Sequence, residues 1–353
     1  MPEAYINRIA TAVPPHDVHT KYIEYAEGLL DSQRDRTLFR RMAARAQIDH
    51  RYSCLAPNPA AGYLDAGNFY NREEFPGTAA RMALYESEAL PLASLALDAL
   101  IPSDGAPDIT HVIVASCTGF YAPGLDLQII DRFSLGPSIQ RVFVGFMGCH
   151  AAINALSVAR HIVRSQPSAT VLVVNLELCT IHLQRCGSLE KILSHLIFGD
   201  GCSACLVSSN PSGIHLKSFS STVLPRSADK ITWHIGGSGF GMELSGQVPE
   251  IILHHLKKRN TPMFSDHSLD EVALWAIHPG GRSVLDAVET ALELEEQDLR
   301  YSRAVLRQFG NMSSAAVVFV LAEILKNERE GIGCAMAFGP GITAEAMMFE
   351  RVS

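Results

Sequence analysis

Short apolar blocks alternate with longer mixed segments along most of the chain, and this pattern predicts alternating strands and helices. Four blocks in the N-terminal half are short and continuous, which is typical of strands buried on both faces. They cover residues 111–117, 141–146, 170–176 and 203–209. The segment 151–164 is longer and apolar nearly all round, so we expect a helix enclosed by other layers.

The C-terminal half repeats this arrangement. Residues 272–278, 333–339 and 346–352 predict strands, and residues 313–326 predict a buried helix. The first hundred residues are less regular: 37–52 predicts a basic helix followed by its exit, and 60–77 predicts a surface loop. Alternation of this kind predicts an α/β fold built from packed layers.

The two halves also resemble each other in detail. A strand ends at Cys117, and a helix begins at Cys149 after a glycine. At nearly the same interval, a strand ends at His278, and a helix begins at Asn311 after a glycine. Each half then reaches an F-G-x-G loop, at 198–201 and 338–341. We therefore predict a duplicated unit whose pseudo-twofold axis brings both helix starts to one central site.

We place the division between the halves after residue 215. Residues 1–215 then form an N-terminal half carrying the cysteine, and residues 216–353 form a C-terminal half carrying the histidine and the asparagine.

Three side chains in this frame carry candidate chemistry. The partial positive charge of a helix start favours a thiolate, so we expect a lowered pKa for Cys149. His278 ends a core strand before a glycine turn and could act as its base. Asn311 could cap its helix and also direct its amide into the site. Together they predict a Cys-His-Asn acyl-transfer enzyme.

Composition narrows the class of protein. The 353 residues are 47% hydrophobic and 19% charged, as expected for one large or two ordinary globular domains. A net charge of −8 argues against a nucleic-acid or anionic-membrane partner. No apolar run is long enough for a membrane span, and the N-terminus lacks a signal-peptide pattern, so we expect a cytoplasmic protein. The eight cysteines predict no disulfide framework, and the single CxxC at 202–205 predicts no metal site.

The motifs GCHAA, HPGG, GNMSS and AFGPG resemble those of the type III polyketide synthases, the chalcone and stilbene synthase family. The resemblance covers essentially the whole chain, and the combination is specific. It implies a thiolase-like, duplicated five-layer αβαβα fold and a homodimer. It also implies that Cys149 takes an acyl starter from CoA, and that His278 and Asn311 stabilise the enolate formed when malonyl-CoA loses CO₂. Cyclisation would give an alkylpyrone, resorcinol or phloroglucinol-type product, without a metal or cofactor.

The same resemblance assigns further residues to the substrate path. Phe198 matches the gatekeeping phenylalanine, whereas Met242 replaces the second gatekeeping aromatic residue of the plant enzymes. Arg41 and Arg45 match two of three cationic CoA contacts, and Leu38 replaces the third.

The expected pocket wall departs from the plant pattern. Cys117 and Thr118 replace a hydroxyl-bearing pair, as in bacterial members of the family. Cys179 and His182 replace threonines, and Trp233 replaces a glycine. If Trp233 and His182 both intrude, the pocket should hold only a short polyketide. The remaining predicted pocket residues are Ser313, Gly339 and Pro340.

Three alternatives stay open at this point. A ketoacyl synthase III-like enzyme, which uses malonyl on a carrier protein, shares the triad but not the HPGG and AFGPG marks. It is distinguished by whether free malonyl-CoA supports several extensions. A hydrolase of the cysteine-protease kind would not place the asparagine at a helix start in a duplicated half. A non-catalytic scaffold of the thiolase fold would leave the three polar residues without a purpose.

Overall fold

Nine strands form one continuous hydrogen-bonded sheet in the computed structural model, which describes residues 2–71, 73–101, 108–185, 188–258, 269–326 and 330–353. The strand order is β11-β12-β13-β8-β1-β7-β6-β4-β5. The N-terminal half contributes β1 (Tyr5–Ala12), β4 (His111–Ser116), β5 (Gln140–Gly145), β6 (Val171–Leu178) and β7 (Asp200–Ser208). The C-terminal half contributes β8 (Gly213–Val223), β11 (Leu274–Ile277), β12 (Gly331–Gly339) and β13 (Thr343–Val352).

The two half-sheets join along a short seam. Strands β1 and β8 pair at only two positions, Tyr5 with His215 and Ile6 with Ile214. Strand β8 also pairs with β13 over most of its length. The proposed division after residue 215 therefore falls inside a strand that contacts both halves.

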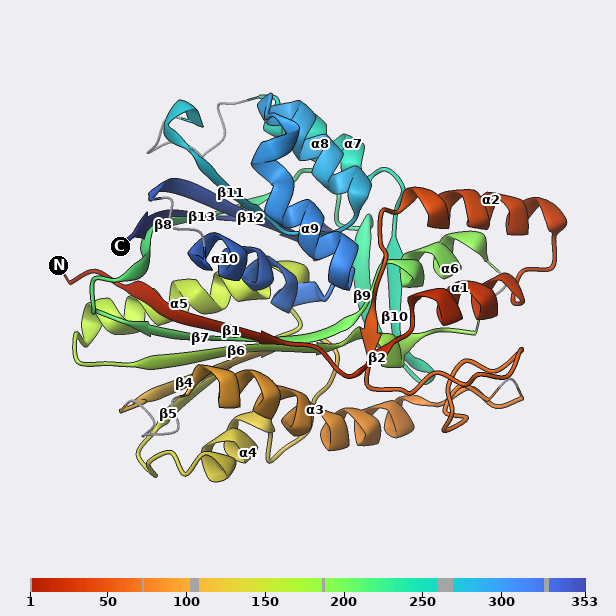
Figure 1. Ribbon diagram of the computed structural model, residues 1–353, viewed down its shortest axis with the longest axis horizontal. Coiled ribbons are helices and arrows are strands. Elements are labelled where there is room, and N and C mark those ends of the chain that lie inside the picture. The colour runs from red at the N-terminus through yellow and green to blue at the C-terminus, as the bar shows by residue number, and fades with distance from the viewer. Residues whose placement is uncertain (1, 72, 102–107, 186–187, 259–268, 327–329) are drawn as a thin grey trace.

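Helices fill the space between the half-sheets and cover both outer faces (Figure 1). Between them lie α5 (Ala151–Ser165) and α10 (Ala316–Lys326), whose apolar side chains share one core with strands of both halves. On one outside lie α3 (Thr78–Leu100) and α4 (Leu125–Arg132), and on the other α7 (Val248–Leu256) and α8 (Arg282–Leu292). This arrangement confirms the predicted layered, thiolase-like α/β fold.

The central helices are buried because their sequences offer apolar groups in every direction. Residues 316–322 of α10 are buried without exception. Helix α5 packs small alanines against the sheets, but its last turns differ from the prediction of a fully enclosed helix. His161 is exposed and Arg164 half-buried, because the last turns of the helix carry polar residues that remain in contact with solvent.

A separate group of elements lies beside the layers. It includes α1 (His19–Glu27), α2 (Gln33–Arg45) and α6 (Leu189–Leu196), which pack around their own apolar cluster. Next to them is the two-stranded hairpin of β9 (Ile231–Gly236) and β10 (Gly239–Leu244). The predicted basic helix at 37–52 thus starts earlier, at Gln33, and ends at Arg45. The remaining elements are β2 (His16–Asp17), β3 (Tyr52–Ser53) and α9 (Arg300–Phe309).

Within the described ranges, no helix combines the length and the apolar character needed to cross a membrane. The cysteines that the structure describes are all free thiols.

Candidate active site

One cavity of about 980 Å³ contains all three predicted triad residues. Cys149 lies in the single turn Gly148–His150 that leads into α5, and His278 follows β11. Asn311 precedes the turn Ser313–Ala315 that leads into α10. The duplicated fold therefore brings a helix start from each half to the same point, as the sequence predicts.

The position of Cys149 depends on a close backbone contact at Gly148. This glycine has φ +80°, and a Cβ there would lie 2.2 Å from Cδ of Pro340. Its N–H donates to the Cys117 thiol over 3.0 Å. Because a larger residue would clash and be strained, Gly148 lets the loops of both halves approach and leaves Cys149 half-buried in the cavity wall.

Backbone hydrogen bonds fix Asn311 beside Phe198. The N–H of Asn311 donates to the Ile197 carbonyl over 2.8 Å, and its carbonyl accepts from the Gly199 N–H over 3.0 Å. Its side-chain oxygen accepts from the Ser313 N–H over 2.8 Å. The amide oxygen therefore satisfies the helix start, while the amide nitrogen makes a long contact of 3.4 Å with the Gly280 carbonyl and also hydrogen-bonds the Cys149 thiol.

His278 is held by its backbone and leaves its ring free. It is 1% exposed, and its N–H donates to the Met336 carbonyl over 2.8 Å. Neither ring nitrogen has a hydrogen-bond partner among the described residues. Burying an imidazole whose nitrogens make no hydrogen bond is unfavourable unless a ligand forms those bonds. Both ring nitrogens are therefore available to substrate atoms.

Burial controls the protonation of the two groups. It raises the pKa of the Cys149 thiol to about 11, although hydrogen bonds from the side chains of Ser313 and Asn311 oppose it. The expected lowering by the helix start is therefore outweighed, since Cys149 lies before the first turn of α5. Burial also lowers the pKa of His278 to about 3. These shifts favour a neutral thiol and a neutral imidazole at physiological pH.

Most of the predicted pocket residues line this cavity. Trp233 does so, and its indole N–H donates to the Cys117 carbonyl over 2.8 Å. Met242 lies opposite Trp233 in the β9–β10 hairpin. The other predicted residues in the cavity wall are Cys117, Thr118, Cys179, Phe198, Ser313, Gly339 and Pro340.

The prediction that His182 intrudes into the pocket is wrong. This residue is fully buried behind the wall and does not line the cavity. Its Nδ1 accepts from the Phe240 N–H over 3.3 Å, so Nε2 carries the proton and donates to the Thr118 carbonyl over 2.7 Å. The ring also stacks on Phe240, with centroids 4.4 Å apart. His182 is a satisfied core histidine that supports Trp233 and Thr118 from behind.

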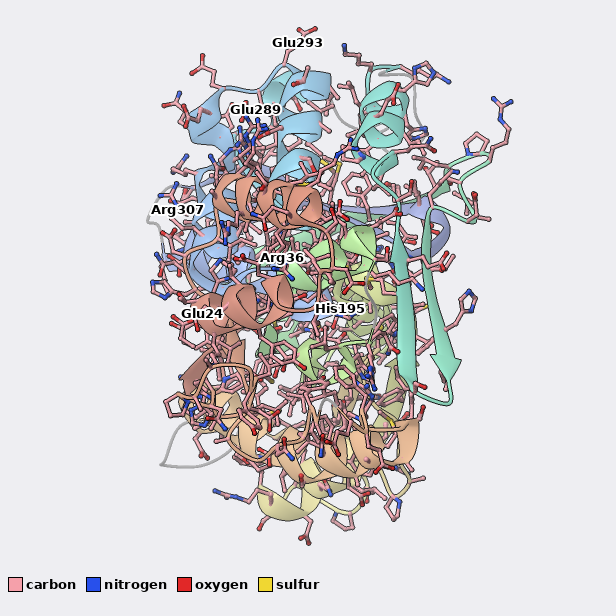
Figure 2. The ribbon with its side chains drawn as sticks, turned by 90° about the vertical axis from the view of Figure 1, so that its right-hand side faces the viewer. Glu24, Arg36, His195, Glu289, Glu293 and Arg307 are labelled. Atoms are coloured by element: carbon pink, nitrogen blue, oxygen red, sulfur yellow. The ribbon has the colours of Figure 1, made fainter. Side chains whose placement is uncertain are left out.

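The mouth of the cavity is formed by exposed residues of α2, α6 and α8. Arg45 lines it, whereas Arg41 is exposed on α2 and does not. Arg282, at the start of α8, also lines the mouth and donates to the Arg45 carbonyl over 3.3 Å. Figure 2 shows this side of the molecule, with α2 above α1 and the β9–β10 hairpin beside them.

Comparisons with known proteins agree along the whole chain. The family "Chalcone and stilbene synthases, N-terminal domain" matches residues 2–211, and the corresponding C-terminal domain matches residues 215–353. The chain is 34% identical over 368 aligned positions to "Alpha-pyrone synthesis polyketide synthase-like Pks18" from Mycobacterium tuberculosis, covering 99% of this chain and 91% of that protein.

The chain belongs to the chalcone and stilbene synthase family. It is therefore a polyketide synthase, a condensing acyltransferase.

Solved structures support the same fold for this family member. PKS-I of the brown alga Ectocarpus siliculosus is similar with a TM-score of 0.83 and 26% identity, over 99% of this chain and 98% of that one. The C-terminal type III polyketide synthase domain of Steely1 from Dictyostelium is similar with a TM-score of 0.86 and 22% identity, over 99% and 100%.

Sequence reasoning missed two side chains in this polyketide synthase. Arg282 directly follows HPGG, so a cation at that position was a visible signal for the mouth. Glu177 is fully buried in β6, and a carboxyl inside an otherwise apolar strand is unusual enough to be noticed. Burial raises the pKa of Glu177, which accepts hydrogen bonds from Thr118 (2.8 Å) and Ser314 (2.6 Å).

The neutral thiol of Cys149 predicts a distinctive pH dependence of alkylation. Because its pKa is raised to about 11, the thiolate fraction should still increase between pH 7 and 10. The rate of iodoacetamide labelling at Cys149, followed by peptide mass spectrometry, should increase over this range without a plateau. A rate that is already constant near pH 6 would instead show a preformed ion pair with His278.

Proposed function

We propose that this polyketide synthase loads an acyl starter from CoA onto Cys149, extends it with malonyl-CoA and releases a pyrone. One observation carries the proposal: the Cys149 thiol, an imidazole with both nitrogens unpartnered and the Asn311 amide, which hydrogen-bonds the thiol, share one cavity with a cationic mouth.

Loading is a thioester exchange. His278 accepts the proton of the Cys149 thiol as the sulfur attacks the thioester carbonyl of the starter. The CoA sulfur leaves as the carbonyl re-forms and takes the proton back from the imidazolium. The starter is then bound to Cys149, and His278 is neutral again, as its buried position favours.

Extension uses His278 in a second role, as a hydrogen-bond donor together with Asn311. When malonyl-CoA loses CO₂, the electron pair of the broken bond moves into the thioester as an enolate. The ring N–H of His278 and the amide N–H of Asn311 donate to this oxyanion, which is the larger part of the catalysis in such sites. The α-carbon then attacks the acyl group on Cys149, and the cysteine leaves as thiolate. This chemistry requires no metal or redox cofactor, and we propose that the enzyme uses none.

The wall of the cavity and one relative support a pyrone product. Trp233 and Met242 both lie in the cavity wall, Trp233 beside Cys117, and we infer that their bulk favours a chain of few extensions. The relative Pks18 bears the name of an alpha-pyrone synthesis enzyme. Ring closure of a short chain by attack of an enol oxygen on its own thioester carbonyl gives such a lactone.

Product masses test the proposed function directly. Wild-type protein incubated with malonyl-CoA and acyl-CoA starters of graded length should form cyclic products whose masses report starter and extension count. Cys149→Ala should show no acyl adduct by intact-protein mass spectrometry and no product, because the nucleophile is gone. An unchanged adduct on Cys149→Ala, or wild-type products of a single extension only, would contradict the proposal.

Asn311→Ala removes one of the two enolate donors. We expect malonyl-CoA decarboxylation to become about 10²–10³ times slower, as for the loss of an oxyanion-hole donor. Release of CO₂ measures this step, and acylation of Cys149 by the starter is the control that should persist. Decarboxylation at the wild-type rate would show that Asn311 is not such a donor.

Trp233→Gly tests the wall that limits the product. Removing the indole opens the cavity beside Cys117 and removes the hydrogen bond of 2.8 Å to its carbonyl. We expect longer polyketides or longer accepted starters, measured by product mass. Ile235→Ala serves as the control, since Ile235 lies in the same strand but is 60% exposed and does not line the cavity. Identical products from wild type and Trp233→Gly would show that Trp233 does not limit chain length.

We also propose that two copies of the chain pair through β5. This strand is at the edge of the sheet and exposes Val142 (37%) and Phe143 (43%), with Met147 (40%) just beyond its end. An apolar edge strand with unpaired backbone groups is a pairing surface, and a second copy of the same strand can cover it symmetrically. By the family resemblance, exposed Ala122 replaces a methionine that crosses the dimer interface in the plant enzymes, so we expect this contact to differ here.

Phe143→Glu should convert the dimer into a monomer, because it places a charge at the centre of the apolar edge. Light scattering coupled to size-exclusion chromatography measures the molar mass. Leu95→Glu, on an apolar residue of α3 that is 53% exposed, should leave the dimer intact. A monomeric wild-type protein would contradict the proposed pairing.

A further inference from the structure

Helix α2 presents a mixed cationic and apolar stripe to solvent. Its 3.6-residue period places Arg34, Leu38, Arg41, Met42 and Arg45 on one side, opposite the buried Phe39 and Ala43. Leu38 is 41% exposed and Met42 is 43% exposed, which is unusual for side chains of this size on a helix of mean polar character. We call these five residues the α2 stripe.

The cations of the α2 stripe are not used within the chain. Neighbouring Arg40 is paired with Glu27, and Arg36 donates to the Leu30 carbonyl over 2.8 Å. By contrast, the side chains of the three stripe arginines have no ion pair or hydrogen bond with any described residue. In a chain of net charge −8, such a local excess of unpaired positive charge is a candidate binding surface.

Acidic groups near the stripe do not cancel it. Asp35 lies in the first turn of α2, where the helix start already favours a negative charge. At the other end, Asp286 forms ion pairs with Arg282 and Arg303. Glu190, in the first turn of α6, is the remaining acid that lines the cavity mouth.

The α2 stripe leads to the cavity that contains Cys149. Met42 and Arg45 line its mouth, whereas Arg34 lies eleven residues earlier, about 16 Å away along the helix axis. A nucleotide diphosphate at the mouth would engage the Arg45 end. Leu38 offers a phosphate no cation, and Arg34 lies at the far end of the stripe, so this end of the stripe is available to a larger partner.

We propose that the α2 stripe docks an acidic carrier protein that delivers acyl groups on a phosphopantetheine arm. The arm ends in the same thioester as CoA, so the transfer is the loading step described above with the carrier's thiol as the leaving group. An acidic helix complements the arginines, and Leu38 and Met42 give it the apolar contacts that protein interfaces contain at their centre. This inference rests on the proposed function, because it needs an acyl acceptor at Cys149.

A lipid surface is less well matched to the same residues. Amphipathic helices that bind membranes bury a broad apolar face, whereas the stripe offers two apolar side chains between three cations. The net charge of −8 also opposes attraction to anionic lipid.

Acyl transfer from two donors tests this inference. The donors are decanoyl-CoA and a decanoyl-loaded bacterial fatty-acid acyl carrier protein, and the readout is the rate of adduct formation on Cys149 by intact-protein mass spectrometry. Wild type should load from both. The double variant Arg34→Glu, Leu38→Ala should load from the carrier about tenfold or more slowly, because one cation is reversed and one apolar contact is lost. It should load from CoA at an unchanged rate, because no acid is placed near the cavity mouth. The rate of loading from the carrier should also fall steeply with added salt, whereas the rate of loading from CoA should not.

The double variant should fold like the wild type. Arg34 lies in the first helical turn, which tolerates an acid, and Leu38 is exposed, so the fold should be kept. Lys257→Glu, at the end of α7 away from the cavity, reverses a charge elsewhere and should change neither rate.

Each contrary outcome has a distinct meaning. Wild type that loads from CoA but not from the carrier overturns the inference, as does a double variant that loses both donors equally. Sedimentation of wild type, but not of the double variant, with phosphatidylglycerol vesicles, together with no carrier effect, overturns it in favour of a membrane surface. Absence of loading from either donor would instead contradict the proposed function.

Discussion

The active site depends on a buried carboxyl that connects the two halves of the molecule. Glu177 accepts a backbone N–H from Cys117 over 2.9 Å and a hydroxyl from Thr118, both in the N-terminal half. It also accepts the Ser314 hydroxyl over 2.6 Å, at the helix start of the C-terminal half. A carboxyl placed at this depth is costly unless its oxygens are satisfied, and here the partners come from both halves. The loops that carry Cys149 and Asn311 are thereby fixed relative to each other.

Around this centre, the glycines set how closely the halves approach. Gly148 allows Pro340 to lie against the loop of Cys149, and Gly310 has φ +68°, where a Cβ would lie 2.6 Å from the Ile197 carbonyl. The second contact brings Asn311 next to Phe198, so the triad amide and this cavity-lining phenylalanine occupy adjacent backbone positions. Close packing of the backbone therefore positions the reacting groups, and few side-chain contacts involve the triad residues directly.

Much of this arrangement could be predicted from the sequence, because periodicity and duplication are local signals. The buried strands, the central helices and the meeting of Cys149, His278 and Asn311 all follow from them. The protonation state of Cys149 did not, since a helix start lowers a pKa while burial raises it, and only the fold shows which is larger. His182 and Trp233 illustrate the same limit: both are bulky, but the direction of a side chain depends on neighbours such as Phe240 that lie far away in the chain.

The β9–β10 hairpin contributes Trp233 and Met242 to the cavity wall from outside the main sheet. Its strands pair with each other and with no strand of the nine-stranded sheet, and it is anchored through Thr78 and Gln184. Substitutions at Met242 or Trp233 would therefore leave the strand pairing of the nine-stranded sheet intact, although a change at Trp233 also removes its hydrogen bond to the Cys117 carbonyl. Within such a framework, new products can arise by mutation of one peripheral ribbon, while the condensation step is inherited unchanged.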